Sequence, residues 1–174
     1  MNHDLQVLFD PAQIATRVRQ MGAEIQGWYD PGEAIMVVGV LKGSFVFMAD
    51  LVRALDGPIN CEFLGVSSYV GTHSSGAVQI TQDLRADIAD KHVLIVEDIV
   101  DTGLTLDYLR RTLMARNPAS LRVVALLDKP SRRKIEVEVD LVGFTIEDLF
   151  VVGFGLDLDQ RYRNLPYVAV LQQG

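Results

Sequence analysis

The sequence of 174 residues predicts an α/β fold built on a parallel sheet, with helices on both faces and a small C-terminal hood. Three observations predict it. Continuous apolar runs of strand length recur along the chain, as expected for parallel strands that are buried on both faces. Amphipathic segments separate several of these runs, which indicates βα units joined by right-handed crossovers. Polar or glycine-rich loops follow the runs, where ligands bind in open α/β sheets.

Composition restricts the possible classes of protein. With 49% hydrophobic and 22% charged residues the chain is globular, and its length suits a single domain over residues 1–174. A net charge of −7 argues against broad binding of nucleic acid. No apolar run approaches the roughly 20 residues of a membrane span, and no signal peptide is visible. The single Cys61 excludes an intrachain disulfide, so we expect a cytoplasmic protein without membrane partners.

The first third of the chain predicts two βα-like units. Asp10-Pro11 has the residue types of a helix N-cap and first turn. Residues 35–40 form a buried strand that leads through Leu41-Lys42-Gly43-Ser44 into a second helix. We expect the apolar face of that helix to consist of Phe45, Met48, Val52 and Leu55. The Lys42-Gly43 loop is either a second anion-binding turn or a plain βα turn with Lys42 in solvent.

A strand over residues 61–66 then precedes a segment rich in serine and glycine, residues 67–76. Few apolar residues lie in this segment, which predicts a loop that is mobile on its own. It is either a lid beside a ligand site or a linker, and residues 78–81 predict a strand that returns from it.

The chain is organised around the stretch from Val93 to Thr105. Four apolar residues lead into Glu97 and Asp98, and a third acid, Asp101, precedes the turn Thr102-Gly103-Leu104-Thr105. A helix follows, with its apolar face expected at Leu106, Leu109, Leu113 and Met114. Hydroxyls, a glycine and the free N–H groups of a helix start suit a phosphate, whereas carboxylates suit sugar hydroxyls, directly or through Mg²⁺. The pattern predicts a phosphorylated sugar as ligand. The alternative is an ordinary βα turn in which the acids cap the helix.

The last third predicts one more buried strand and a hood of short strands. Residues 121–127 end in a basic run, in which Lys129 lies at the carboxyl end of the strand. We expect Arg132 and Lys134 to be solvated. Short strands over residues 141–144, 150–152 and 167–171 should cover the ligand edge of the sheet.

Several separate segments together resemble the hypoxanthine-guanine phosphoribosyltransferases from about Ile35 to Leu171. They are Leu41-Lys42-Gly43, Ser68-Tyr69, the acidic stretch Glu97 to Thr105, Lys129, and the glycine-rich run Phe150 to Asp157. The acidic stretch is similar to the signature that binds phosphoribosyl pyrophosphate (PRPP) in the type I phosphoribosyltransferases. The segments at Lys129 and Phe150 point to the branch that uses 6-oxopurines.

The resemblance implies a type I phosphoribosyltransferase core and a role for each matching residue. Lys42, Gly43 and Arg163 would bind pyrophosphate, and Glu97 and Asp98 would bind the ribose hydroxyls directly or through Mg²⁺. Thr102, Gly103, Leu104 and Thr105 would hold the 5′-phosphate, and Asp157 would contribute to a second Mg²⁺. Asp101 would be the general base at purine N7, Lys129 would donate to O6, and Phe150 and Val151 would contact the base. Ser68 and Tyr69 would belong to a lid.

The resemblance therefore implies a purine-salvage enzyme that joins hypoxanthine or guanine to PRPP, with Mg²⁺ as cofactor and a homodimer or homotetramer as assembly. A protonated Lys129 favours a keto purine over adenine, because two donors would otherwise face each other. Two alternatives stay open. One is a PRPP- or nucleotide-sensing regulator on the same fold that binds RNA, and the other is a transferase for another base such as xanthine.

Overall fold

The computed structural model describes residues 4–71 and 74–172, without the side chains of residues 68–77. Its main sheet has six strands in the order β4-β3-β2-β5-β6-β7, of which β4 alone is antiparallel to its neighbour. The bounds are β2 Ile35–Leu41, β3 Ile59–Gly71, β4 Ser74–Gln82, β5 His92–Val100, β6 Ser120–Asp128 and β7 Leu141–Thr145. The predicted α/β class with a mostly parallel sheet is confirmed.

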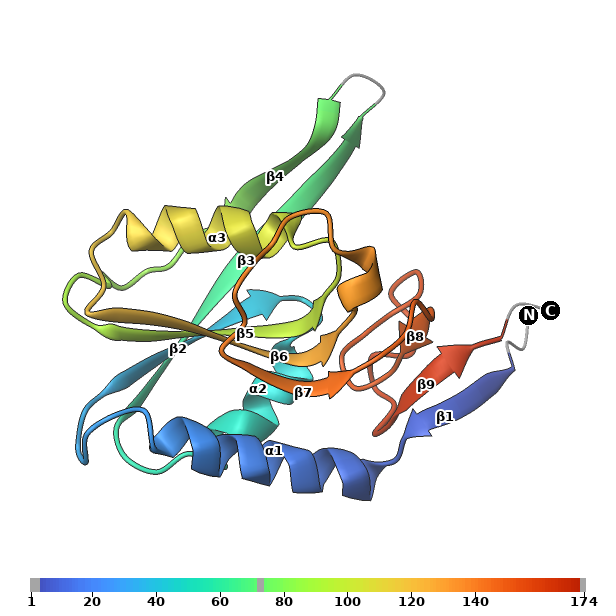
Figure 1. The fold of residues 1–174 in the computed structure, drawn as a ribbon, viewed down its shortest axis with the longest axis horizontal. Helices are drawn as coiled ribbons and strands as arrows, with labels where there is room; N and C mark the ends of the chain where they lie inside the picture. Colours follow the sequence, from blue (N-terminus) through green and yellow to red (C-terminus); the bar gives the residue numbers. More distant parts are fainter. Residues whose placement is uncertain (1–3, 72–73, 173–174) are drawn as a thin grey trace.

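Helices cover both faces of this sheet, as predicted. Helices α1 (Pro11–Gln26) and α2 (Phe45–Val52) lie on one face and α3 (Leu104–Met114) lies on the other (Figure 1). Alternate residues of the central strands divide between the two cores: Leu94 and Val96 of β5 pack with α1 and α2, whereas Val93 and Ile95 pack with α3. Both sides of β5 are therefore apolar, which explains its unbroken hydrophobic run.

A second, three-stranded sheet with the order β1-β9-β8 forms the hood. Its strands are β1 Leu5–Phe9, β8 Val151–Val152 and β9 Val168–Leu171. Strands β2, β5, β6 and β7 point toward this small sheet, so the hood stands beside their carboxyl ends (Figure 1). The sequence did not predict β1, which makes the hood a structure of both ends of the chain. The strand expected in the hood at residues 141–144 is β7, which instead pairs with β6 at the edge of the main sheet. A 3-10 turn over Pro130–Arg132 follows β6.

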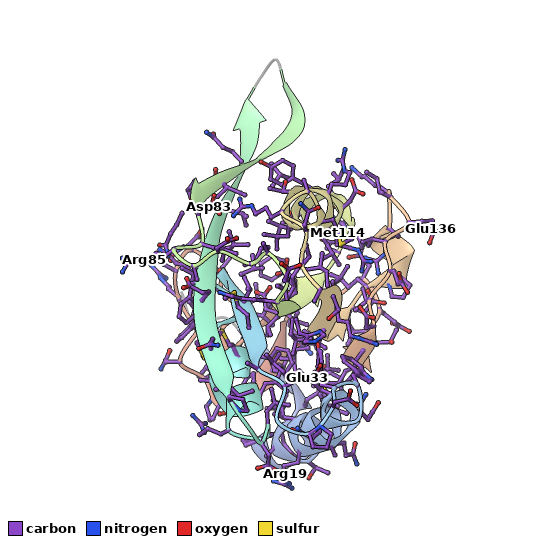
Figure 2. The ribbon with its side chains drawn as sticks, turned by 90° about the vertical axis from the view of Figure 1, so that its left-hand side faces the viewer. Arg19, Glu33, Asp83, Arg85, Met114 and Glu136 are labelled. Atoms are coloured by element: carbon purple, nitrogen blue, oxygen red, sulfur yellow. The ribbon has the colours of Figure 1, made fainter. Side chains whose placement is uncertain are left out.

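The segment predicted as a loop over residues 67–76 is a long hairpin over its described part, and the loop prediction is wrong. Strand β3 continues through Ser67 to Gly71 and pairs with β4, and the hairpin projects from the body of the molecule on the side of α3 (Figure 1). At its root, Asp83 accepts two hydrogen bonds from the Arg116 guanidinium, at 2.8 and 2.9 Å. Asp83 is labelled where the hairpin meets the body in Figure 2.

Two predicted core residues point to solvent instead. Phe45 is 44% exposed because it is the first residue of α2, and Phe47, Met48 and Leu51 form the buried face. Met114, labelled at the end of α3 in Figure 2, is 52% exposed. Within residues 4–71 and 74–172, no helix combines the length and apolar character that crossing a membrane requires.

Candidate active site

The acidic pair of the central stretch lies at the carboxyl end of β5, in the interior of the edge that faces the hood. Glu97 is 6% exposed, and burial, helped by the neighbouring charge of Asp98, raises the pKa of its carboxyl well above the usual range. Burial also raises the pKa of Asp98 to about 6, although the Ile99 N–H donates to its Oδ1 at 2.8 Å. Two neighbouring acids with raised pKa values, Glu97 buried and Asp98 half-buried, create a place where a cation or a set of hydroxyl donors is favoured.

Two glycines bring the loop after β2 against this pair. A Cβ added at Gly43 would overlap the carboxylate of Asp98, and a Cβ added at Gly155 would overlap the carbonyl oxygen of Gly43. Gly155 also has a φ of +99°, which L side chains rarely adopt. The Leu41–Lys42 peptide is cis. The loop at Gly43 is therefore packed between β5 and the glycine-rich turn that follows β8.

A polar cluster lies beyond this contact and joins three of the predicted residues. The Arg163 guanidinium forms an ion pair with Asp157 at 2.8 Å and donates to the carbonyl oxygen of Gly155 at 2.7 Å. Lys42 Nζ donates to Gln160 Oε1 at 3.3 Å. The charge of Arg163 lowers the pKa of Asp98 and that of Asp157 raises it, so this cluster and the acidic pair act on each other.

The Thr102–Thr105 turn forms the start of α3. Gly103 is the N-cap with a φ of +85°, and no side chain caps the helix. Thr102 Oγ1 accepts weakly from the Leu104 N–H at 3.4 Å. An uncapped helix start with hydroxyls beside it is suited to an anion.

A cavity of about 520 Å³ lies between this edge and the hood. The predicted base-contacting residues Lys129, Phe150 and Val151 line it, together with Asp98, Asp101 and Asp157. Lys129 is 8% exposed and its Nζ lies 4.0 Å from Asp148, whereas Phe150 is 48% exposed at the wall. The structure therefore brings acids from β5, a lysine from the end of β6 and an aromatic ring beside β8 into one space.

Two arginines of this region were not predicted as site residues. Arg132, expected in a solvated loop, lines the cavity and pairs with Asp101, with Nε 3.1 Å from Oδ1. Arg133 pairs with Asp128 and donates to the backbone carbonyl of Asp101 at 2.6 Å. The basic run after β6 was the visible signal, but the contacts of both arginines with Asp101 span 31 and 32 residues and cannot be predicted from the local sequence.

Ser68 and Tyr69, predicted for a lid, lie on β3, where their backbones pair with Val78 and Ala77 of β4. Their side chains lie outside the described residues.

The carboxylates of this edge suit Mg²⁺ in one particular way. Within the described residues, no group of three or more His, Cys, Asp or Glu side chains is arranged to hold a metal ion. Mg²⁺, however, is commonly bound by one or two carboxylates together with substrate phosphates. Glu97, Asp98 and Asp157 supply hard oxygen ligands, and burial raises the pKa values of the first two, so a cation beside them would favour their ionised forms. The residues fit an ion that arrives with a polyphosphate.

The phosphoribosyl transferase domain family matches residues 8–159. The hypoxanthine phosphoribosyltransferase of Haemophilus influenzae is 50% identical over 169 residues, which cover 95% of this chain and 94% of that protein. The chain belongs to the hypoxanthine-guanine phosphoribosyltransferase family. Another relative in this family, the hypoxanthine-guanine phosphoribosyltransferase of Bacillus subtilis, is 45% identical over 174 residues, covering 99% of this chain and 96% of that protein.

Solved structures of the family share the fold. A hypoxanthine-guanine phosphoribosyltransferase of Bacillus anthracis superposes with a TM-score of 0.91 at 38% identity, covering 98% of this chain and all of that one. The hypoxanthine phosphoribosyltransferase of Trypanosoma cruzi in complex with the product IMP has a TM-score of 0.90 at 43% identity, covering 98% of this chain and 95% of that one. The predicted membership of the 6-oxopurine phosphoribosyltransferases is confirmed.

Proposed function

We propose that this protein transfers the 5-phosphoribosyl group from PRPP to hypoxanthine or guanine, giving IMP or GMP and pyrophosphate. One observation carries the proposal: a single cavity is lined by Asp98, Asp101 and Lys129, and the uncapped start of α3 follows Asp101 directly. Lys129 and Asp101 would face the purine, Asp98 the ribose and the start of α3 the 5′-phosphate, so one space has groups suited to all three linked parts of the product.

The sugar-phosphate half of the site would bind PRPP. Thr102, Gly103, Leu104 and Thr105 would hold the 5′-phosphate through hydroxyl and N–H groups at the start of α3. Glu97 and Asp98 would accept hydrogen bonds from the ribose hydroxyls, because buried carboxylates need donors or a cation.

The pyrophosphate would lie at the polar cluster on the opposite side of Gly43. Lys42 and Arg163 lie there and can neutralise a leaving group that carries several negative charges. Arg163 would exchange its ion pair with Asp157 for the pyrophosphate, which would free Asp157 for Mg²⁺. Bound Mg²⁺ would supply charge neutralisation of the pyrophosphate, and Glu97, Asp98 and Asp157 would hold it with the substrate oxygens.

The base half of the site would read a 6-oxopurine. Lys129 would donate to O6, Phe150 would pack against the ring, and Val151 would bind the edge of the base through its backbone. Asp101 would take the proton from N7 as N9 attacks ribose C1 with inversion. Proton transfer by a positioned carboxylate contributes about 10²–10⁴-fold to such rates.

Three broader features complete the proposal. The β3–β4 hairpin with Ser68 and Tyr69 would act as a lid that excludes water from the ribosyl cation. Residues 1–174 would work as one domain in a homodimer or homotetramer. A cytoplasmic location agrees with the single Cys61.

The decisive experiment is a panel of hypoxanthine, guanine, xanthine, adenine and orotate, each with PRPP and Mg²⁺, followed by detection of nucleotide and pyrophosphate. We expect product with hypoxanthine, guanine or both, and none with adenine or orotate. Product with no base, together with binding of PRPP and of RNA, would favour the sensing regulator instead.

The panel is repeated with Asp101→Asn, which keeps the shape of the side chain but cannot take a proton. We expect turnover to fall by about 10²-fold or more while PRPP still binds. A turnover near that of the parent enzyme would show that Asp101 is not the general base.

A further inference from the structure

The segment after β6 is attached to the end of β5 at three consecutive carbonyl groups. The Lys129 N–H donates to the Val100 carbonyl at 2.9 Å, and the Arg133 guanidinium donates to the Asp101 carbonyl at 2.6 Å. The N–H groups of Lys134 and Ile135 donate to the Thr102 carbonyl at 2.9 and 3.2 Å. Residues 129–135 therefore hold the backbone on both sides of Asp101 and at Asp101 itself.

Within this frame, Arg132 spans two carboxylates that line the cavity. Its Nε lies 3.1 Å from Asp101 Oδ1 and its NH1 lies 3.4 Å from Asp148 Oδ2. Lys129 Nζ lies 4.0 Å from the other oxygen of Asp148. These contacts join two acids and two cations at the cavity wall. Their charges alternate in the order Asp101, Arg132, Asp148, Lys129.

We propose that Arg132 is a positioning residue for the transfer reaction, which holds Oδ1 of Asp101 so that Oδ2 faces the purine N7. The inference rests on the proposed function, because it assigns a partner to the proposed general base. An oriented base with a third group behind it is a recurrent arrangement in catalysis. The structure provides that third group as a guanidinium, whose Nε donates to Oδ1 of Asp101.

An exposed ion pair alone would not support this inference, since such pairs contribute little to stability, and these side chains are 47% and 39% exposed. The support comes from the backbone contacts of residues 129–135 with the carbonyl groups of residues 100–102. Arg133 fixes the carbonyl of the residue whose carboxylate Arg132 contacts, so successive arginines hold the two ends of Asp101. Arg132 also contacts Asp148, the acid whose other oxygen lies 4.0 Å from Lys129 Nζ.

A planar guanidinium is needed for both contacts. Arginine presents Nε–H and terminal N–H groups in a fixed fork, whereas lysine presents one ammonium on a flexible stem. Arg132→Lys should therefore keep the charge but lose the simultaneous contact with Asp101 and Asp148. A purely electrostatic effect of the positive charge would be rescued by lysine, and positioning would be rescued only in part.

The test compares Arg132→Gln, Arg132→Lys and the control Lys134→Gln in steady-state kinetics with hypoxanthine and PRPP. Lys134 is exposed, lies in the same segment and forms no ion pair with another described residue, so its substitution removes the same charge without the contact. We expect Arg132→Gln to lower kcat about tenfold with KM for PRPP unchanged, Arg132→Lys to recover less than half of that loss, and Lys134→Gln to match the parent enzyme.

Arg132→Gln is then combined with Asp101→Asn. If Arg132 acts through Asp101, it should lower kcat by less than twofold in the Asp101→Asn background, because coupled residues are not additive. A tenfold loss in both backgrounds would overturn the inference, as would parent-like kcat for Arg132→Gln. An equal loss for Lys134→Gln would assign the effect to general charge and would also overturn it. An inactive parent enzyme would instead contradict the proposed function.

Discussion

Replacing Asp98 by asparagine should stabilise the substrate-free protein at neutral and alkaline pH while it impairs the enzyme. Burial raises the pKa of Asp98 from an ordinary value of 3.8 to about 6. Between these two values the folded protein binds more protons at this site than the unfolded chain, so the free energy of unfolding falls as the pH rises. Above about pH 7 the carboxyl is ionised and the cost of placing its charge in a half-buried site is present in full. Asparagine keeps the shape and the oxygen that accepts from Ile99 but removes this cost.

The size of the effect follows from the pKa. The difference between a pKa of about 6 in the folded protein and 3.8 in the unfolded chain corresponds to about 3 kcal/mol, at about 1.4 kcal/mol for each pKa unit. Because the Asp98 side chain is only partly enclosed, we expect about 1–3 kcal/mol at pH 8. For a chain of this length that is an increase of roughly 3–9 °C in Tm. Loss of the Asp98 charge also relieves the repulsion that helps to raise the pKa of Glu97.

The assay is thermal unfolding in EDTA without substrates, at pH 5 and at pH 8, for the parent enzyme, Asp98→Asn and the control Asp56→Asn at an exposed position. The advantage of Asp98→Asn should be small at pH 5 and large at pH 8, whereas the control should differ little from the parent at either pH. An Asp98→Asn protein that is less stable than the parent at pH 8, or a difference that does not change with pH, would refute the reasoning.

Three more predictions concern packing and base recognition. Gly155→Ala should destabilise the fold by more than about 2 kcal/mol in urea unfolding, because it adds overlap with the Gly43 carbonyl to the strain of a positive φ. The control Gly32→Ala has a similar φ of +90° with nothing within 4 Å, so an equal loss there would show that the overlap has no effect. Tyr29→Phe should raise the free energy of unfolding in urea by about 1 kcal/mol, because the Tyr29 hydroxyl is buried without a hydrogen-bond partner in the described structure; a lower free energy would reveal a contact that the hydroxyl makes. Lys129→Ala should raise KM for hypoxanthine more than tenfold with little effect on KM for PRPP, and equal losses on both would contradict a role at O6.

The sequence predicted the parallel core because the physics of that core is local. A strand covered on both faces must be apolar at every position. The run from Val93 to Val96 therefore predicts a buried strand without any knowledge of its neighbours in the sheet. The acids at the end of β5 and the turn before α3 could also be identified from the local sequence, because they follow that run directly. The roles of these residues remain predictions, although the structure brings most of them to one edge.

The features that the sequence did not predict depend on distant partners. Strand β1 pairs with β9, about 160 residues away, and the sequence of neither strand indicates which segment it pairs with. The β3–β4 hairpin was interpreted as a loop because Ser67 and its neighbours are small and polar, but backbone pairing along a ribbon needs no apolar face. The pairing of Arg132 with Asp101 joins two segments that are adjacent only in the folded protein.

The pairing of β1 with β9 has a consequence for the order in which the protein assembles. The strands of the main sheet pair across 57 residues or fewer, the separation of Ile35 in β2 from His92 in β5, but the hood joins residues 5–9 to residues 168–171. Contacts of such long sequence separation form late, because a large loop must close first. Strand β8 contributes Val151 to the cavity lining, and among the described strands it pairs with β9 alone. On a ribosome the turn before α3, the proposed phosphate site, would therefore form while the cavity proposed for the base still lacks one side, and the proposed choice of base would be acquired as the last step of folding.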